Sequence, residues 1–566
     1  MYILGVWDGH DSGAALIDGK KIIFASNEER FTKRKLEVSF PHKSINAALA
    51  YAGIKPKDID VVAFPTTEFT KTLSRVFPGQ KESYYAFRRR KMLRPRAETL
   101  MHYAKYSMTG IGVLPFCNFI SSAAVMQELR SMGFRDPKLV HVEHHASHAA
   151  TAAFTSGLRK ALVITLDGLG DGLSGTVSTF YKGRLERQLE IPASDSIGIF
   201  FEQVTNILGM RELEDEGKVM AMADYSYPFK FEENKLKDLF NVEGISIKAR
   251  NGFIKQYDFL SRLSWSMPRE QFAYMAQQLL EHTASKFINN AMDEFGYSGV
   301  ALAGGVFSNV KANMAIRMLQ RLKEWYIFPH MGDGGIALGA AMQANYEMNG
   351  VHNYAFNDVY LGTEYDESEI KAILAKEKQI SYEIDNDKSS HAAELISDDN
   401  YVFWFQGRME YGPRALGNRS ILANAGSEKA KESLNMCVKR REWYQPFAPS
   451  ILEEDAGRLL ENAETKSRFM TMAYKIKPAF KDAMKSAIHI DMTARPQMLG
   501  SENPTYRGLL ERLKRKLEYG IALNTSLNIH GMPIAMSPED AISAMKETKT
   551  RYMFIGDYFV ENKGAD

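Results

Sequence analysis

The chain opens with short apolar runs that are separated by polar residues and glycine. Residues 2–7, 14–17 and 21–26 are each long enough for a strand and too short for a helix, so they predict three strands. A polar loop with glycines covers 8–13, and an Asp18-Gly19 pair separates the second run from the third. Because an Asp-Gly pair between apolar runs is typical of a hairpin, the pattern predicts a strand followed by a β-hairpin.

The same order of elements returns further along the chain. An apolar run at 161–166 is followed by a Gly/Asp-rich loop over 167–172, and a hairpin with strands at 175–181 and 184–190 comes next. Two copies of one plan predict a duplicated α/β fold in which each Gly/Asp loop faces a phosphate. This arrangement resembles the actin-like ATPase and sugar kinase class.

Two glycine-rich segments follow, each before a predicted helix. Residues 300–303 form an apolar strand that runs into Gly304-Gly305, and a helical stretch begins near Lys311. Glycines between a strand and a helix let backbone N–H groups approach a phosphate, so this turn is a candidate nucleotide loop. At 333–341 an acidic residue precedes a helix of small residues, and close helix packing is the favoured interpretation of that composition.

A change of pattern indicates a domain boundary. Residues 345–365 are polar and lack periodicity, so the expected domains are 1–355 and 356–566. The second domain is expected to be a further α/β unit of the α+β kind, with strands at 401–405 and 520–523 and helices near 428–438 and 504–518.

Composition and charge narrow the class of protein. A chain of 566 residues, 45% of them hydrophobic, is long enough for two or more domains with buried cores. Its 71 basic and 69 acidic residues give a formal net charge of +2, which favours neither nucleic acid nor a membrane as partner. Two cysteines, Cys117 and Cys437, exclude a disulfide framework and a cysteine-based zinc cluster. With no basic leader before Asp8 and no apolar run of about 18 residues, we expect a soluble, cytoplasmic protein.

A histidine-rich segment at 144–148 is the clearest candidate for chemistry. His144 and His148 are four residues apart, so on a helix both imidazoles lie on one face and can reach one metal ion. Neighbouring alanines favour that helix, and the strand at 161–166 delivers Asp167 as a further oxygen ligand. Two imidazoles with carboxylates suit a metal such as Zn or Fe(II) better than Mg or Ca. The alternative is a helix with two incidental surface histidines.

Arginines gather among glycines in the second domain. Arg408, Arg414 and Arg419 lie in the stretch 407–420, where glycines expose the backbone. Guanidinium groups bind phosphate and carboxylate oxygens bidentately, so this stretch suits a nucleotide triphosphate and a second anion. Unrelated surface loops are the alternative, which is weakened by further basic or polar islands at 438–442, 493–496 and 524–528.

Taken together, these stretches resemble a known family. The chain is similar to carbamoyltransferases of the NodU/CmcH type, which carbamoylate hydroxyl groups of natural products and nodulation factors. The matching stretches run in order along nearly the whole chain, at 10–16, 28–32, 39–41, 144–148, 167–168, 217–220, 304–309, 407–420, 446–449 and 524–528.

The resemblance implies an enzyme with two sites. The C-terminal domain resembles YrdC-type domains, which convert carbamoyl phosphate and ATP to carbamoyladenylate and pyrophosphate. The N-terminal domain resembles the metal-containing, actin-like domain of tRNA threonylcarbamoyl transferases, and is expected to move the carbamoyl group to an acceptor hydroxyl with release of AMP. Adenylation is needed because the carbamoyl nitrogen feeds electrons into its carbonyl, which leaves the group a poor electrophile.

The resemblance also assigns residues and cofactors. The family's metal is Fe(II), although another divalent ion suits the same donors, and Mg is expected with ATP. His10 matches the catalytic histidine near the acceptor and can take the hydroxyl proton as general base. The implied metal ligands are His144, His148, Asp167 and Asp333; the implied nucleotide-binding residues are Lys218, Gly304, Gly305 and Asn309; the implied activating site holds Arg414, Lys439, Arg495 and Ser526.

The expected substrates are carbamoyl phosphate, ATP and a hydroxylated small molecule or glycan, with no nucleic acid or membrane partner. The sequence leaves the acceptor and the oligomeric state open, and a homodimer is one expectation. A tRNA threonylcarbamoyl transferase is a rival interpretation, which the near-neutral charge and the attached activating domain argue against. An actin-like ATPase or regulatory nucleotide-binding protein is a second rival, and it would leave the basic set between Arg414 and Ser526 unexplained.

Residues 66–137 match the family least, and they contain a basic run at 88–96. Such a run is most often a solvated face. The alternative is an acceptor pocket with anionic or sugar-like contacts, because loops on a scaffold carry specificity. Two departures bear on the acceptor side only: Met532 stands where many members have Glu, and Asp8-Gly9 precedes His10 in place of an aromatic residue.

Overall fold

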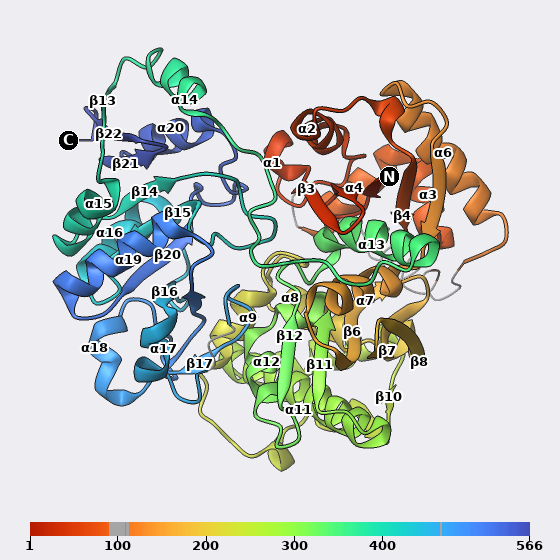
Figure 1. Ribbon diagram of the computed structural model, residues 1–566. Helices are drawn as coiled ribbons and strands as arrows, with labels where there is room; N and C mark the ends of the chain where they lie inside the picture. Colours follow the sequence, from red (N-terminus) through yellow and green to blue (C-terminus); the bar gives the residue numbers. More distant parts are fainter. Residues whose placement is uncertain (90–107, 109–112, 464–466, 566) are drawn as a thin grey trace. The chain divides into compact units, whose positions relative to one another are not determined.

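Two parts of the chain fold as separate units in the computed structural model, which describes residues 1–89, 108, 113–463 and 467–565 (Figure 1). The first unit consists of Met1–Glu28 and Leu36–Phe356. The second consists of Asn357–Asp566 together with the short segment Glu29–Lys35. Nothing in the periodicity of the sequence singles out that segment as part of the second unit.

The first unit begins with a five-stranded sheet whose strand order is β3-β2-β1-β4-β5. The first three strands are antiparallel neighbours, and the other two run parallel to β1. The three N-terminal strands predicted from the apolar runs are thus confirmed. The strands are β1 (Tyr2–Trp7), β2 (Gly13–Asp18), β3 (Lys21–Asn27), β4 (Val61–Pro65) and β5 (Lys138–Val142).

The second sheet repeats this plan. Its order is β12-β11-β6-β7-β8, with β6, β7 and β8 antiparallel neighbours and with β11 and β12 parallel to β6. Strand order and strand direction are therefore the same in both sheets, which confirms the duplicated α/β plan predicted from the two hairpins. The strands are β6 (Lys160–Gly170), β7 (Leu173–Tyr181), β8 (Arg184–Pro192), β11 (Gly299–Ala303) and β12 (Glu324–Ile327).

The Gly/Asp loop that we expected to begin at Asp167 begins later. β6 continues through this residue to Gly170, and Gly170 pairs with Leu173 after a shift of register. The turn itself is Asp171-Gly172, with φ angles of 52° and 85°. A two-residue hairpin turn needs positive φ at both central positions, which Asp-Gly supplies. The hairpin therefore closes further from Leu166 than the glycines of this segment suggested.

Two helices fill the space between the sheets of the first unit. α13 (Ile336–Asn349) packs on β1, β2 and β4, α7 (His144–Thr155) packs on β6 and β11, and the two helices pack on each other (Figure 1). A Cβ on Gly339 would meet the carbonyl oxygen of Ser147 at 2.0 Å, and one on Gly5 would meet that of Ala337 at 1.8 Å. The small residues of α13 therefore serve close packing, as their composition indicated.

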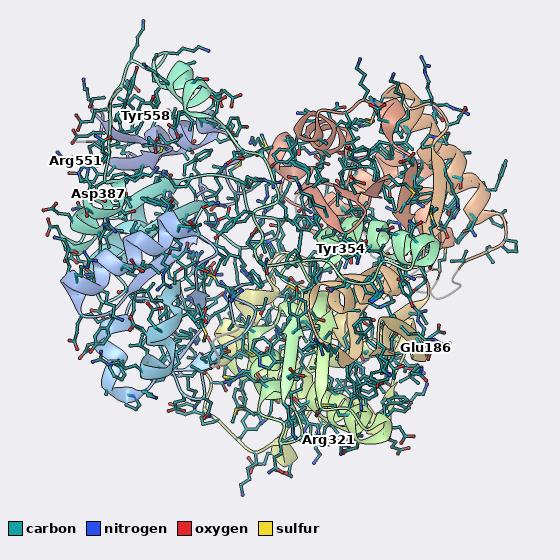
Figure 2. All side chains as sticks on the ribbon, viewed as in Figure 1. Glu186, Arg321, Tyr354, Asp387, Arg551 and Tyr558 are labelled. Atoms are coloured by element: carbon teal, nitrogen blue, oxygen red, sulfur yellow. The ribbon has the colours of Figure 1, made fainter. Side chains whose placement is uncertain are left out.

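The first unit ends with a segment that is anchored to α13. Tyr354 is buried, and its hydroxyl accepts a hydrogen bond of 2.7 Å from Asn345 (Figure 2). Its backbone N–H donates to Phe154 of α7 at 2.9 Å. Among its described residues this unit also contains α2 (His42–Ala52), α3 (Phe69–Val76), α4 (Pro78–Arg88), α6 (Cys117–Ser131), α8 (Ile197–Ile207), α9 (Glu216–Ala223), α10 (Phe253–Ser264), α11 (Arg269–Phe295), α12 (Val310–Arg317) and the hairpin of β9 (Phe240–Glu243) and β10 (Ser246–Ala249).

The second unit is built on an eight-stranded mixed sheet with the order β13-β22-β21-β14-β15-β20-β16-β19. The predicted strands at 401–405 and 520–523 are confirmed as β14 and β20, in the middle of this sheet. The strands are β13 (Ile380–Ile384), β14 (Val402–Phe405), β15 (Arg419–Ala423), β16 (Ala448–Leu452), β19 (Gln497–Leu499), β20 (Ile521–Ser526), β21 (Tyr552–Ile555) and β22 (Tyr558–Asn562), and a short pair β17 (Tyr474–Lys475) and β18 (Thr493–Ala494) lies apart.

The predicted helix near 504–518 is confirmed as α19 (Pro504–Leu517). Asn503 caps it by accepting a hydrogen bond from the N–H of Tyr506, and proline at the first turn suits a helix start. The apolar stripe of α19, residues of α15 and residues of the sheet form one core cluster. Each buried leucine in it contributes about 1.5–3 kcal/mol to the free energy of folding. The helices are α1 (Glu29–Thr32), α14 (Glu367–Leu374), α15 (Lys388–Ser397), α16 (Glu428–Leu434), α17 (Glu453–Leu459), α18 (Lys481–Met484), α19 and α20 (Pro538–Glu547).

Two further observations bear on the class of protein. Among the residues that the structure describes, no helix has both the length and the apolar character that crossing a bilayer requires. Cys117 is buried, Cys437 is exposed, and both are free thiols.

Replacing Gly339 with alanine should destabilise the first unit. The added methyl group would meet a backbone oxygen of α7, so the two helices would have to move apart. Overpacking of this kind costs about 1–3 kcal/mol of unfolding free energy, which urea denaturation measures. The matched control is Gly217→Ala on α9, where an added Cβ meets nothing within 4 Å, so stability should stay the same or rise by up to about 1 kcal/mol. An unchanged unfolding midpoint for Gly339→Ala would contradict the close packing.

Candidate functional site

The histidine pair lies at the start of α7. Glu143 caps this helix, since its carboxylate accepts hydrogen bonds from the N–H groups of His145 and Ala146. The cap fixes the first turn, and helical spacing then places His144 and His148 on one face with their ring centroids 4.9 Å apart. Both side chains are buried, so the alternative of incidental surface histidines is wrong.

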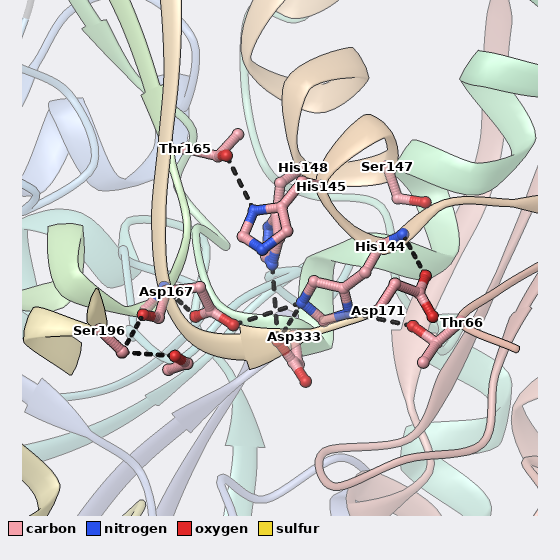
Figure 3. Close-up of polar contacts among 12 residues, drawn as sticks. Thr66, His144, His145, Ser147, His148, Thr165, Asp167, Asp171, Ser196 and Asp333 are labelled. Atoms are coloured by element: carbon pink, nitrogen blue, oxygen red, sulfur yellow. Dashed lines mark hydrogen bonds and ion pairs between the residues drawn. The ribbon is translucent and has the colours of Figure 1, made fainter. Parts of the chain in front are cut away.

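Two carboxylates from distant parts of the chain meet these imidazoles (Figure 3). His144 Nε2 lies 3.3 Å from an oxygen of Asp167 on β6 and 3.5 Å from Oδ1 of Asp333, which opens the turn before α13. His148 Nε2 also lies 3.5 Å from Asp333 Oδ1. One potential ligand atom from each of the four residues lies within 4.8 Å of the others. The structure thus brings together all four predicted metal ligands.

The donor atoms of this cluster fit a divalent metal. His148 Nε2 is buried and, apart from its 3.5 Å contact with Asp333 Oδ1, has no partner among the described residues, as expected of an atom placed for a ligand. Nδ1 of His144 is engaged by the Thr66 hydroxyl at 3.0 Å, which leaves Nε2 facing the carboxylates. Burial lowers the pKa of His144, but Asp333 and Asp167 outweigh burial and raise it to about 10. The carboxylate charges that stabilise a proton on His144 would also stabilise a metal cation in its place, with release of that proton.

His10 lies beside the cluster, in the loop after β1. Its Nδ1 is 3.5 Å from Oδ2 of Asp333, and its side chain is 24% exposed. Burial lowers the pKa of His10 to about 4, although the charge of Asp333 opposes the shift. The Tyr85 ring packs against it at a centroid distance of 5.7 Å, and Trp7 Nε1 donates to its carbonyl oxygen at 2.8 Å. His10 is therefore a partly exposed imidazole with a lowered pKa next to the candidate metal ligands.

The residues of the predicted nucleotide loop, 304–309, make contacts within the protein that account for their types. Gly304 has a φ of 107°, and a Cβ there would meet the carbonyl oxygen of Leu166 at 2.2 Å. The Gly305 N–H donates to Asp167 Oδ1 at 2.6 Å. Asn309 caps α12 through the N–H of Ala312. Packing and the support of Asp167 thus account for these residue types, and nucleotide binding stays a prediction.

Lys218 does not lie in a loop. It sits in the first turn of α9, and its Nζ is 3.2 Å from Asp215 Oδ1. Gly217 and Lys218 belong to this helix because Gly217 is followed by helix-forming residues that continue the first turn. A role for Lys218 toward a nucleotide also stays a prediction.

Lys439 belongs to the basic set of the second unit. It ends a short π-helix, Asn435–Lys439, and π-turns are frequent at functional sites. Its buried ammonium donates to the backbone oxygen and to the hydroxyl of Ser526, the latter at 3.3 Å, and to Oδ1 of Asn528 at 2.6 Å. Burial lowers its pKa well below the usual range, and the charges of Arg441 and Lys35 add to the effect.

Three guanidinium groups of this unit converge, and no carboxylate among the described residues pairs with them. Burial, Arg414 and Arg441 together lower the pKa of Arg495 well below its usual range. Burial lowers the pKa of Arg414 to about 10, and burial and then Arg414 lower that of Arg441 to about 10. Within the described part of the chain, none of the three forms an ion pair. Arg441 was missing from the predicted site, although the basic island at 438–442 contained it.

The other two arginines of the stretch 407–420 are structural. Arg408 donates to the backbone oxygens of Gly362 and Leu361 at 3.2 and 2.7 Å. Arg419 is fully buried, stacks on Phe405 at 3.6 Å and donates to backbone oxygens of its own loop. The expectation that three arginines of this stretch face anions therefore reduces to Arg414. Sequence alone does not show that Arg408 and Arg419 donate to backbone oxygens, nor that Nη2 of Arg419 is buried with no hydrogen-bond partner among the described residues.

The basic run at 88–96 is not a solvated face where the structure describes it. Arg88 and Arg89 are 6% and 5% exposed. Arg88 is paired with Glu212 at 2.8 Å and with Glu202, and these carboxylates compensate the buried charge. Residues 90–96 lie outside the described residues.

Comparisons with known proteins cover both units. Models described as Carbamoyltransferase N-terminus and Carbamoyltransferase C-terminus match residues 2–342 and 393–562. "Uncharacterized protein MJ1058" of Methanocaldococcus jannaschii is 34% identical over 99% of both chains. Nodulation protein NolNO of Sinorhizobium fredii is 28% identical over 98% of this chain and 79% of its own.

Two further matches are more distant or partial. The 3'-hydroxymethylcephem-O-carbamoyltransferase of Streptomyces clavuligerus is 31% identical over 45% of this chain and 47% of its own. The solved structure of T. kodakarensis HypF aligns at 16% identity over 62% of this chain and 48% of its own, with a TM-score of 0.34, too low to support an inference. Since the family models span most of the sequence, the protein is a transferase that belongs to the carbamoyltransferase family.

Proposed function

We propose that this protein is an ATP-dependent O-carbamoyltransferase with two sites. The second unit, which we take to be YrdC-like, would form carbamoyladenylate from carbamoyl phosphate and ATP. The first unit, of the actin-like and sugar kinase class, would transfer the carbamoyl group to an acceptor hydroxyl. A hydroxylated small molecule or glycan is the proposed acceptor, in keeping with relatives named for nodulation and for cephem O-carbamoylation.

The observation that carries this proposal is the uncompensated charge around Arg414, Arg441 and Arg495. Buried cations are costly unless they are paired, and within the described residues no carboxylate pairs with these three. Phosphate oxygens would supply the missing negative charge, and guanidinium forks suit their geometry. A substrate pair that carries several phosphates, such as ATP with carbamoyl phosphate, fits this demand.

The activation step has a defined balance of atoms. Water cleaves carbamoyl phosphate to carbamate and phosphate, and a carbamate oxygen then displaces pyrophosphate from the α-phosphorus of ATP. Carbamoyladenylate and pyrophosphate result. Arg414, Arg441 and Arg495 would hold the phosphate oxygens in place, while Lys439, fixed by Ser526 and Asn528, would lie beside Arg441 as a further nitrogen donor.

The transfer step needs a base at the acceptor. His10 is unprotonated near neutral pH because burial lowers its pKa to about 4, so it can accept the hydroxyl proton as the oxygen attacks the carbonyl carbon. AMP leaves with the electron pair of the broken bond. His144, His148, Asp167 and Asp333 would hold Fe(II) or another divalent ion, which supplies Lewis-acid chemistry when bound.

Pyrophosphate release tests the proposed reaction class. The purified full-length protein should release pyrophosphate from ATP in the presence of Mg only when carbamoyl phosphate is added. The assay follows inorganic pyrophosphate with each substrate omitted in turn. Release that does not depend on carbamoyl phosphate, or release of phosphate alone from ATP, would contradict carbamoyladenylate formation and favour an actin-like ATPase.

The two half-reactions should be separable by mutation. Arg414→Ala should abolish carbamoyladenylate formation, whereas His10→Ala should leave it intact and slow transfer to the acceptor by about 10²–10⁴-fold, the usual contribution of a general base. Quenched-flow analysis of carbamoyladenylate, together with transfer to a hydroxylated acceptor, measures both steps. Arg515→Ala, an exposed arginine on α19, is the control and should change neither step. Loss of carbamoyladenylate formation in His10→Ala would show that the division of labour is wrong.

Metal content should depend on the predicted ligands. His148→Ala removes a nitrogen donor from the cluster, so the purified protein should contain less metal and lose transfer activity together. Elemental analysis of the folded variant, verified by its melting temperature, gives the stoichiometry. His42→Ala, at a partly exposed histidine that faces Glu128, is the matched control and should keep the wild-type content. Full metal occupancy in His148→Ala would contradict the proposed metal site.

A further inference from the structure

Thr66 has a backbone conformation that its residue type disfavours. It follows directly on β4, and its φ is 66°. Positive φ is a genuine outlier for a β-branched residue, because the branched side chain crowds its own backbone. Such strain persists only where the surrounding structure enforces it, and it is frequent at functional sites. The backbone preference of threonine therefore does not explain the conformation of Thr66, and the surrounding contacts must.

The backbone of Thr66 is held from both sides. Its N–H donates to the carbonyl oxygen of Val142 at 3.1 Å, and its own carbonyl oxygen accepts from Arg75 Nη1 at 2.7 Å. The next two residues are fixed as well, since Oδ1 of Asp171 accepts from the N–H groups of Thr67 and Glu68, each at 3.2 Å. The strained conformation is thus imposed by at least four hydrogen bonds.

The two side chains that hold this loop also hold the candidate active site. Oδ2 of Asp171 accepts from the backbone N–H of His144 at 2.8 Å, so one carboxylate ties the loop to the start of α7 (Figure 3). Arg75 forms a bidentate ion pair with Asp8 at 2.9 and 3.0 Å, close to His10 in the chain. The loops after β1 and β4 are therefore fixed by the same guanidinium group.

The result of this arrangement is the position of one hydroxyl group. Thr66 is 3% exposed, and its Oγ1 lies 3.0 Å from Nδ1 of His144. If Nε2 is to offer its lone pair to a metal, the ring proton must sit on Nδ1 and be donated to an acceptor. The hydroxyl oxygen of Thr66 is placed to accept it.

We propose that Thr66 is a positioning residue for the metal centre: by accepting the Nδ1–H of His144, it fixes the tautomer and the orientation of the ring so that Nε2 faces Asp167 and Asp333. This inference rests on the proposed metal site. It goes beyond that site by giving a reason for the strained loop and for the Arg75 and Asp171 contacts that enforce it.

Three variants of the full-length protein test the inference. Thr66→Val keeps the shape and the strained β-branched backbone but removes the acceptor, and Thr66→Ser restores the acceptor. The metal-stripped proteins are titrated with Zn(II) against a chelating dye, and with Co(II), whose visible absorption reports the coordination of the ion. Melting temperatures of the metal-free proteins show whether each variant is folded. Arg515→Ala is the surface control.

Thr66→Val should fold and bind Zn(II) between about 10-fold and 100-fold more weakly than the wild type, with an altered Co(II) spectrum, as for other groups that orient a metal ligand. Thr66→Ser should recover both the affinity and the spectrum. Wild-type affinity and spectrum in Thr66→Val would overturn the inference while leaving the metal site intact. Equal weakening in Thr66→Ser would also overturn it, because the hydroxyl would then not matter. A wild-type protein that binds neither ion would overturn the proposed metal site and this inference together.

Discussion

Two buried carboxylates, Asp167 and Asp333, face two buried imidazoles, and much of the first unit is arranged to keep these four groups together. Burying a carboxylate without a partner is costly, so each of the two is held by an imidazole within 3.5 Å. The groups arrive from the end of β6, the turn before α13 and the first turns of α7. The close contact between α7 and α13, which glycine makes feasible, is what lets them meet.

In the second unit, buried groups of like positive charge lie close together. Its cations at Arg414, Arg441 and Arg495 lower one another's pKa, and the described residues supply no carboxylate against them. A protein gains nothing in stability from such an arrangement, since like charges in a poorly solvated site repel. Bound anions would offset this cost, and the π-helix that ends at Lys439 adds one more nitrogen donor. The first unit therefore brings mixed nitrogen and oxygen donors together, while the described part of the second unit brings three unpaired guanidinium groups together.

Glycine and threonine positions show how the scaffold serves the first site. Gly305 was predicted to contact a nucleotide, yet its N–H supports a carboxylate oxygen of Asp167. Thr66 has no signal in the sequence at all, because the feature that marks it is a φ of 66° and a contact with a histidine far along the chain. Residues of this kind act through their neighbours, and their roles appear only when the neighbours are known.

The local pattern of residue types was enough to predict many of the secondary-structure elements of this protein. The length and order of the apolar runs predicted the strands of both hairpins and their duplication. The spacing of His144 and His148 predicted a shared helix face. Both predictions were possible because strands and helices depend on short stretches of chain. Tertiary structure alone decided which charges are satisfied. It separated Arg414 from Arg408 and Arg419, added Arg441, and replaced the expected solvated face at Arg88 with buried ion pairs. Whether a charge is paired depends on groups distant in sequence, and no local period encodes those contacts.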